Sequence, residues 1–138
     1  MSQGKIIITS FDKIRLEQMI CNHLRAHNSD AKYLMDLNEE LNRAEVVLPE
    51  EISNDVVTMN SKVTIEDADT TEVSTYTLVF PEEANISRNK ISILSPVGTC
   101  LIGCRVGETV EWSVPEGLRK LKVREIVYQP EAKGDYHL

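Results

Sequence analysis

The chain has 138 residues, of which 41% are hydrophobic and 27% charged. This composition suits one compact domain with a small appendage and argues against disorder. The formal net charge is -7, because 22 acidic residues outnumber 15 basic ones. Proteins that bind free nucleic acid usually present a basic patch, so strong direct DNA binding is disfavoured. A basic protein surface is the better-matched partner.

The sequence shows no segment typical of membrane insertion or export. Its longest apolar run is too short to cross a bilayer, and residues 5–8 lack the pattern of a signal peptide. The cysteines are an odd set without the spacing of a disulfide framework: Cys21, Cys100 and Cys104. Free thiols suit a reducing cytosol, so we expect a cytoplasmic protein without membrane contact.

Residues 4–8 are predicted to form a short β segment, followed by a helix over residues 12–26. Thr9 or Ser10 can cap this helix, and Asp12 places a negative charge in its first turn, where it favours the helix dipole. Apolar residues recur one turn apart: Leu16, Ile20 and Leu24. This spacing predicts an amphipathic helix.

A second helix is predicted after a turn at residues 27–30. Its apolar residues repeat at spacings of three and four, as in a coiled-coil seam: Leu34, Leu37, Leu41, Ala44 and Leu48. Pro49 ends the pattern. Two helices joined by so short a turn pack antiparallel, so we expect a hairpin about 22 Å long from the helical rise per residue.

A polar linker at residues 49–54 is predicted to divide the chain. Residues 1–48 would hold the N-terminal strand segment and the short hairpin. Residues 55–138 would form the second, β-rich domain.

The pattern after residue 55 is typical of strands, rich in Thr, Val, Tyr and Phe. Outside residues 91–117, strands are predicted at four places: residues 56–59, 62–65, 73–80 and 118–128. In the last of them Leu121, Val123 and Ile126 are expected to face inward. Antiparallel strands around one short helix give an α+β fold class.

Residues 91–117 carry the most specific signals of the chain. Ser95 stands where a helix cap is wanted, and Pro96 stands at the first helical position, where a missing N–H is tolerated. Gly103 is placed to end the helix, and Gly107 with Glu108 is typical of a turn. The expected order is strand, short helix, turn and strand.

This segment resembles the C-terminal domain of the bacterial Gre transcript-cleavage factors. Residues 95–103, S-P-V-G-T-C-L-I-G, are similar to the Gre motif of Ser-Pro, small residues and Leu-Leu/Ile-Gly. Residues 49–51, 55–61 and 128–136 resemble more closely the shorter subfamily called regulator of nucleoside diphosphate kinase. The resemblance implies an FK506-binding-protein-like (FKBP-like) β domain behind an N-terminal antiparallel coiled coil, and RNA polymerase as the partner.

In Gre factors the β domain docks at the rim of the polymerase secondary channel, and acids at the coiled-coil tip help to hold a catalytic magnesium ion. Here the predicted tip, Asn28, Ser29 and Asp30, offers one acid, which can equally be a helix cap. The hairpin is also about half as long as a Gre coiled coil by its rise per residue. The resemblance therefore implies a non-catalytic regulator that competes with Gre-type factors, without metal or cofactor, touching nucleic acid at most through polymerase.

By this resemblance the docking residues are Ser95, Pro96 and Val97, while Leu101 and Ile102 are expected in the core. Leu94 stands where some Gre factors place an acid important for docking. That difference weakens a residue-by-residue transfer of the docking contacts.

Alternative interpretations stay open. The shared β fold allows a prolyl isomerase, although such pockets need aromatic linings and the aromatic residues here are scattered, and it allows a general protein-interaction module. Cys21, His23 and His27 suggest a metal site, but structural zinc needs four ligands. Cys100 and Cys104 are expected as buried small hydrophobes. Whether an effect on nucleoside diphosphate kinase is direct is not encoded in these residues.

Overall fold

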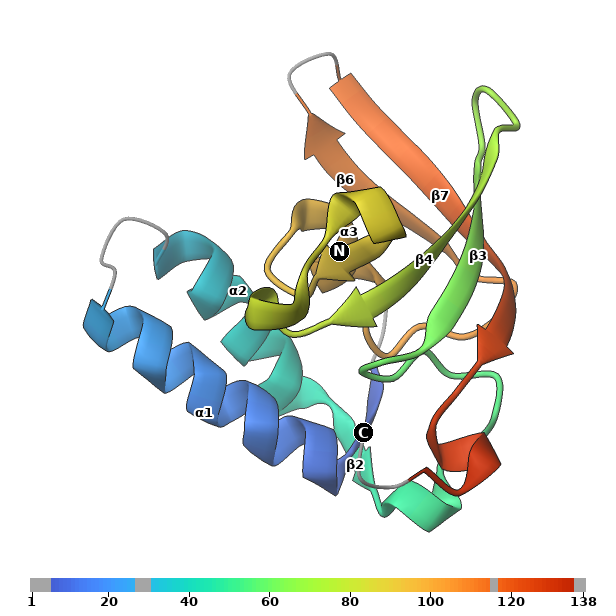
Figure 1. The fold of residues 1–138 in the computed structure, drawn as a ribbon. Coiled ribbons are helices and arrows are strands. Elements are labelled where there is room, and N and C mark those ends of the chain that lie inside the picture. Colours follow the sequence, from blue (N-terminus) through green and yellow to red (C-terminus); the bar gives the residue numbers. More distant parts are fainter. Residues whose placement is uncertain (1–5, 27–30, 115–116, 136–138) are drawn as a thin grey trace.

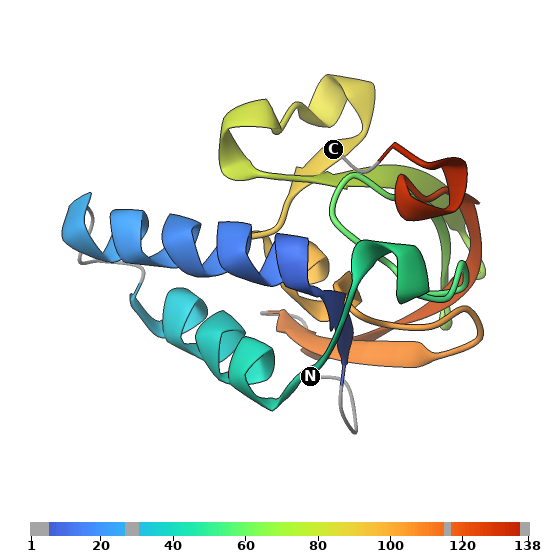
Figure 2. The same ribbon diagram turned by 90° about the horizontal axis from the view of Figure 1, so that it is seen from below.

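The computed structural model describes residues 6–26, 31–114 and 117–135. A helical hairpin formed by α1 (Ser10–Ala26) and α2 (Ala31–Arg43) projects away from a β-rich body (Figures 1 and 2). Two short strands, β1 (Ile7–Thr9) and β2 (Glu45–Val47), pair in parallel at the base of the hairpin. The hairpin is therefore fastened at both of its chain ends.

Part of the apolar stripe predicted for each helix forms its packed face, and the side chain of Leu24 lies outside the described part of the structure. On α1, Leu16 and Ile20 are buried, and the side chain of Thr9 accepts a hydrogen bond from the Asp12 N–H at 3.0 Å. This bond satisfies one of the unpaired donors at the helix start, so Thr9 is the cap. On α2 the buried residues are Leu34, Leu37 and Leu41.

The prediction that the second helix continues to Leu48 is wrong. The helix ends at Arg43, and the Glu45 N–H donates to the Ile6 carbonyl at 2.8 Å, which draws the chain into β2. Leu48 is 52% exposed and lies outside the seam. Within the predicted linker the chain forms a 3-10 helix, η1 (Pro49–Glu51). The domain boundary at residues 49–54 stays a prediction.

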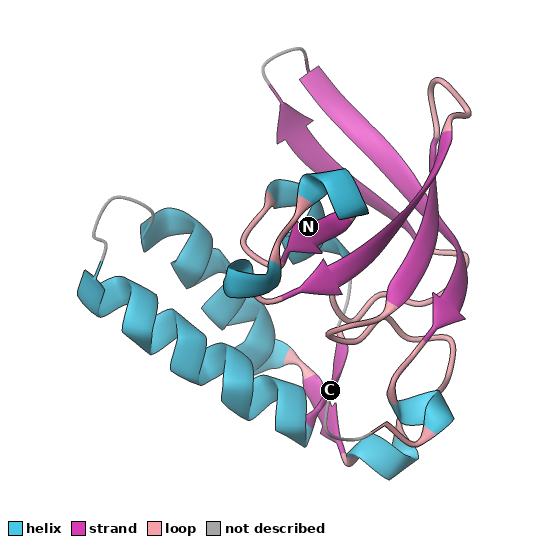
Figure 3. Ribbon diagram, viewed as in Figure 1, coloured by secondary structure: helices cyan, strands magenta, loops and turns pink. Residues whose placement is uncertain are grey.

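A five-stranded sheet forms the body of the molecule (Figure 3). Its order is β5-β4-β3-β7-β6. The bounds are β3 (Lys62–Asp67), β4 (Val73–Val79), β5 (Lys90–Ser92), β6 (Thr109–Val114) and β7 (Gly117–Tyr128). Leu121 and Val123 of β7 are buried and Ile126 packs against the core, as predicted. The fold is mixed helix and sheet.

Two details of the predicted sheet are wrong. β5 pairs with β4 in parallel, so the sheet is not wholly antiparallel. Residues 56–59 form no strand, since Val56 makes only an isolated bridge with Arg105. Instead the Val57 N–H donates to the Cys104 carbonyl at 2.8 Å, because the chain after α3 runs beside this segment.

The short helix α3 (Pro96–Leu101) lies between β5 and β6 in the chain and contacts both strands. Leu101 and Ile102 are each 1% exposed, which confirms their predicted place in the core. One apolar cluster includes these residues together with Leu16 of α1 and Leu37 of α2. The hairpin and the sheet therefore share a hydrophobic core. Three further 3-10 helices are η2 (Pro81–Glu83), η3 (Ile86–Arg88) and η4 (Glu131–Lys133).

Candidate docking surface

The start of α3 is held in place by its own hydrogen bonds. The Ser95 side-chain oxygen accepts from the Gly98 N–H at 3.0 Å and donates to the Ser92 carbonyl at 2.7 Å. Thr99 Oγ1 donates to the Ile93 carbonyl at 2.7 Å. Ser95 is thus the helix cap, as its position in the sequence predicts. These bonds fix the segment that precedes Val97.

The three predicted docking residues lie together at this helix start. Pro96 is the first residue of α3. Ser95 and Val97 are half-buried, and both line a groove. Leu94 is half-buried as well and packs against the core. An apolar core contact therefore occupies the position at which some Gre factors place an acid.

The groove lies between the start of α3, η3 and strands β3, β4, β5 and β7, and has a volume of about 400 Å³. Its apolar wall consists of Ile65, Tyr76, Ile86, Ile91, Val97 and Leu121. Its polar residues are Asp67, Glu72, Ser74, Ser95 and Arg119. Ile86 is 74% exposed, so part of the apolar lining faces solvent. Such an opening with a mixed lining suits the side chains of a protein partner.

An ion pair between Asp67 and Arg119 forms part of the groove wall. The Asp67 carboxylate also accepts hydrogen bonds from the main-chain N–H groups of Asp69 at 2.8 Å and Thr70 at 3.1 Å. The hydrogen bond from Arg119, followed by these main-chain bonds, lowers the pKa of Asp67 to about 2. The carboxylate is therefore charged throughout the physiological range.

Sequence reasoning missed this ion pair. Asp67 and Arg119 are 52 positions apart, and only the antiparallel register of β3 and β7, in which Asp67 faces Leu121, brings them together. The available signal was the polar Asp67 at the end of an alternating strand. Nothing local indicates its partner, because strand pairing over this separation depends on the whole sheet.

Gly103, which is predicted to end α3, also allows the base of the hairpin to pack closely against the body, because it has no side chain. Its φ of +78° is a conformation that favours glycine. A Cβ atom here would lie 2.4 Å from the Ile6 Cβ, just before β1. The Ile7 N–H donates to the Gly103 carbonyl at 3.4 Å. A side chain at this position would therefore push the base of the hairpin away.

The predicted hairpin tip, Asn28, Ser29 and Asp30, lies outside the described residues, as does His27. His23 Nδ1 lies 3.2 Å from the Met19 carbonyl, one turn earlier on α1. In residues 6–26, 31–114 and 117–135 no group of three or more His, Cys, Asp or Glu side chains could hold a metal ion. No helix in those ranges is long and apolar enough to span a membrane.

Cys100 and Cys104 are buried, as predicted, at 7% and 1% exposure. Burial raises the pKa of the Cys104 thiol to about 12. A thiol in that state is a poor nucleophile, so these two cysteines act as packing residues.

The fold and the groove define a two-part protein, with a helical hairpin carried on a mixed sheet. Two family profiles match the chain: "Transcription elongation factor, GreA/GreB, C-term" over residues 52–128 and "Rnk N-terminus" over residues 5–47. The regulator of nucleoside diphosphate kinase from Escherichia coli (strain K12) is 41% identical over 139 residues, covering 100% of both chains. The chain therefore belongs to the GreA/GreB family of transcription elongation factors, in the subgroup with the Rnk N-terminus.

Two further relatives agree with this assignment. Transcription elongation factor GreA of Syntrophotalea carbinolica is 39% identical over 95 residues, which cover 69% of this chain and 60% of that protein. A solved structure, the prokaryotic transcription elongation factor GreA/GreB from Nitrosomonas europaea, matches with a TM-score of 0.75 and 41% identity. That match covers 90% of this chain and 100% of the other.

Proposed function

We propose that this chain is a non-catalytic regulator that binds RNA polymerase at the rim of its secondary channel. It docks through the groove beside Ser95, Pro96 and Val97, and it competes there with Gre-type factors in the cytoplasm. In this proposal the β-rich body is an FKBP-like docking domain and the hairpin is a short antiparallel coiled coil that enters the channel.

The shortness of the hairpin is the observation that carries the proposal. α2 has 13 residues, and a helix of that length spans about 20 Å. A Gre-type coiled coil is about twice as long, so this tip would stop roughly 20 Å short of the active centre by the same rise. Magnesium ligands act at about 2 Å from the ion. The hairpin can thus occupy the channel without delivering a metal ligand.

The composition of the groove favours a protein as the binding partner. It combines exposed apolar area at Ile86 with the charged pair of Asp67 and Arg119. Apolar patches beside polar groups mark interaction sites on soluble proteins. The chain as a whole carries a net charge of -7, which favours approach to a basic protein surface over approach to nucleic acid.

The relative from Escherichia coli is named a regulator of nucleoside diphosphate kinase. We infer that this chain has the same role and acts through transcription. Comparing kinase transcript levels in cells with kinase activity in a mixture of the two purified proteins separates an indirect effect from a direct one.

A competition experiment tests the docking proposal. The purified chain is titrated into backtracked elongation complexes with GreA, and the rate of RNA cleavage is measured together with direct binding to core polymerase. We expect binding at micromolar concentration or tighter, inhibition of GreA-stimulated cleavage, and no cleavage from this chain alone. Absence of micromolar binding would contradict the proposal, as would cleavage stimulated by the chain itself.

Two matched variants locate the docking surface. Ile86→Asp places a charge on the exposed rim of the groove, and Val127→Asp places the same charge on β7, at a residue 50% exposed and outside the groove lining. We expect Ile86→Asp to weaken polymerase binding at least tenfold and Val127→Asp to leave it unchanged. Equal effects of the two variants would place docking elsewhere. A peptide isomerisation assay on the same samples tests the prolyl isomerase alternative.

A further inference from the structure

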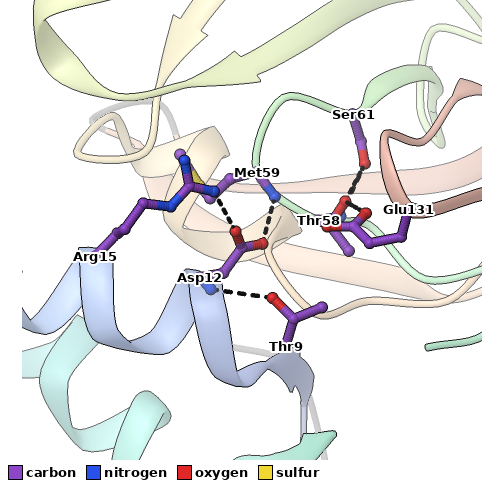
Figure 4. A network of polar contacts seen from close by, with 7 residues as sticks. All are labelled: Thr9, Asp12, Arg15, Thr58, Met59, Ser61 and Glu131. Atoms are coloured by element: carbon purple, nitrogen blue, oxygen red, sulfur yellow. Dashed lines mark hydrogen bonds and ion pairs between the residues drawn. The ribbon is translucent and has the colours of Figure 1, made fainter. Parts of the chain in front are cut away.

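A buried polar junction joins the start of α1 to the β-rich body (Figure 4). The Asp12 carboxylate, at 0% exposure, accepts a hydrogen bond from the main-chain N–H of Met59 at 3.0 Å through one oxygen. Its other oxygen accepts from Arg15 Nη2 at 2.6 Å. One side chain of the hairpin thus binds its own helix and the body together.

Arg15 makes a second link across the same junction. Its guanidinium carbon lies 4.0 Å from the ring centroid of Phe11, on the same helix, and 4.9 Å from that of Phe80, directly after β4. A cation over an aromatic face is attracted by the ring quadrupole, and the attraction depends on where the cation lies. Arg15 therefore connects the hairpin to the sheet through a contact that depends on geometry.

The donor side of the junction, the main-chain N–H of Met59, is itself held in place by the surrounding body. Thr58, beside Met59, donates through its hydroxyl to Glu131 Oε1 at 2.8 Å, and its N–H donates to Ser61 Oγ at 2.9 Å. Glu131 belongs to η4, near the other end of the chain. The loop that presents the Met59 N–H is thus closed by a hydrogen bond of its own and tied to η4 by another, which makes it a rigid target for Asp12.

The burial of Asp12 indicates that its role is to select one orientation of the hairpin rather than to stabilise the folded protein. Burial raises the pKa of Asp12 above its usual value, against the opposing hydrogen bonds from Arg15 and Met59. The charged carboxylate is therefore less favourable in the folded protein than in water. The apolar contacts of the hairpin, such as those of Leu16 and Leu37, are non-directional, so they constrain the angle of the hairpin less than hydrogen bonds do. Buried ionic groups that cost desolvation are retained in some proteins because they select one arrangement.

We propose that Asp12 is a positioning residue that fixes the direction in which the hairpin leaves the β-rich body, by binding the Met59 N–H and the Arg15 guanidinium at once. The consequence for polymerase rests on the function proposed above: with the groove docked, this direction determines where the hairpin enters the channel.

The first test needs no polymerase. Spin labels are attached to the exposed native Cys21 on α1 and to a Lys122→Cys variant on β7, while Cys100 and Cys104 are buried. Electron resonance then measures the distribution of distances between the labels. We expect one narrow distribution in the parent and at least a twofold broadening in Asp12→Ala. Asp12→Asn, which keeps an acceptor for Met59, should broaden it less.

Two further variants keep the test decisive. Arg15→Met removes the ion pair with Asp12 and the guanidinium contacts with the Phe11 and Phe80 rings. The Arg15 side chain is 24% exposed, so the substitution opens no buried hole, and it should broaden the distribution. Glu40→Ala is the matched control, because Glu40 is also a buried hairpin acid paired with an arginine three residues later, at 3.0 Å, on its own helix. It should leave the distribution narrow. Narrow distributions in folded Asp12→Ala and in Arg15→Met would overturn the proposal, as would equal broadening by Glu40→Ala.

The second test uses core polymerase and a photo-crosslinker on Cys21. We expect Asp12→Ala to bind with the affinity of the parent, because the groove is intact, but to lose at least half of the parent's crosslink yield at its main site. Failure of the parent to bind would contradict the proposed function and leave the spin-label result to decide on Asp12. Parental crosslinks in Asp12→Ala would contradict the positioning role.

Discussion

Gly98 is the residue of α3 for which the fold leaves no room for a side chain. A Cβ atom at this position would lie 2.2 Å from the Ser92 carbonyl oxygen and 3.0 Å from the Ser95 side-chain oxygen. We predict that Gly98→Ala lowers the free energy of unfolding by about 1–3 kcal/mol through this overlap, as overpacking does. Urea unfolding measures the change.

The sign of this change is diagnostic. At an open helical position the same substitution raises stability by about 1 kcal/mol, since glycine is the poorer helix former. A more stable Gly98→Ala protein would show that the helix start can shift. Because Ser95 caps the helix through the Gly98 N–H, we also expect the variant to bind polymerase more weakly.

The second prediction at the residue scale concerns Asp67 and pH. Its pKa falls from 3.8 to about 2 in the folded protein, mainly through Arg119. The charged carboxylate therefore adds to the free energy of unfolding at pH values above the pKa that Asp67 has in the unfolded chain. This contribution is lost as the pH falls through about 2, the pKa in the folded protein. We predict that Asp67→Asn is less stable than the parent at pH 7 and that the difference shrinks below about pH 4.

Denaturant unfolding between pH 2 and 7 measures this difference. The amide oxygen of the substituted side chain can still accept the main-chain hydrogen bonds of the turn, so the comparison isolates the ion pair with Arg119, its charge and its hydrogen bond together. Asp69→Asn, at an exposed neighbour in the same turn, is the control and should change stability little across the range. A pH-independent gap between Asp67→Asn and the parent would argue against the ion pair as its cause.

At the scale of elements, the N-terminus of α1 depends on Thr9. The side chain is fully buried and accepts the Asp12 N–H at 3.0 Å. We predict that Thr9→Val, which keeps the shape and removes the acceptor, lowers the free energy of unfolding by about 1 kcal/mol, as cap removal does. Thr109→Val, at an exposed position of β6, should have little effect. Similar losses in both variants, measured by thermal unfolding, would argue against the capping role.

The elements with strong local signals could be predicted from the sequence. Ser95, Pro96 and Gly103 define α3 because capping, a fixed φ and a positive φ are local requirements. The alternation around Leu121 and Val123 likewise identifies β7. These signals depend on a few neighbouring residues, so one sequence is enough to interpret them.

The elements that depend on distant partners could not be predicted. Leu48 continues a heptad spacing, yet the pairing of Glu45 with the segment before β1 ends the helix first. The parallel pairing of β5 and the meeting of Asp67 with Arg119 are also set by contacts far along the chain. The groove has the same origin, since its residues come from separate strands and α3. Tertiary pairing overrides local propensity at each of these places.

At the scale of the whole molecule, the shared core predicts how the protein unfolds. Leu37 of α2 is fully buried in the same apolar cluster as Leu101 of α3 and Val123 of β7. Elements that bury one another's apolar surface lose that burial together, so the hairpin and the sheet should unfold in one transition. We predict that Leu37→Ala lowers stability by about 2–5 kcal/mol, the usual range for a buried leucine.

The whole-molecule prediction is measured with two probes on one sample. Circular dichroism at 222 nm follows the helices, and fluorescence of Trp112, the single tryptophan, follows the body from β6. Both midpoints should fall together in Leu37→Ala, whereas Met35→Ala, at a residue of the same helix that is 58% exposed, should move neither by much. A loss of the helical signal that leaves the fluorescence midpoint in place would mean that the hairpin unfolds on its own. The contacts at Gly103 and Met59 argue against that outcome, because both join the base of the hairpin to main-chain atoms of the body.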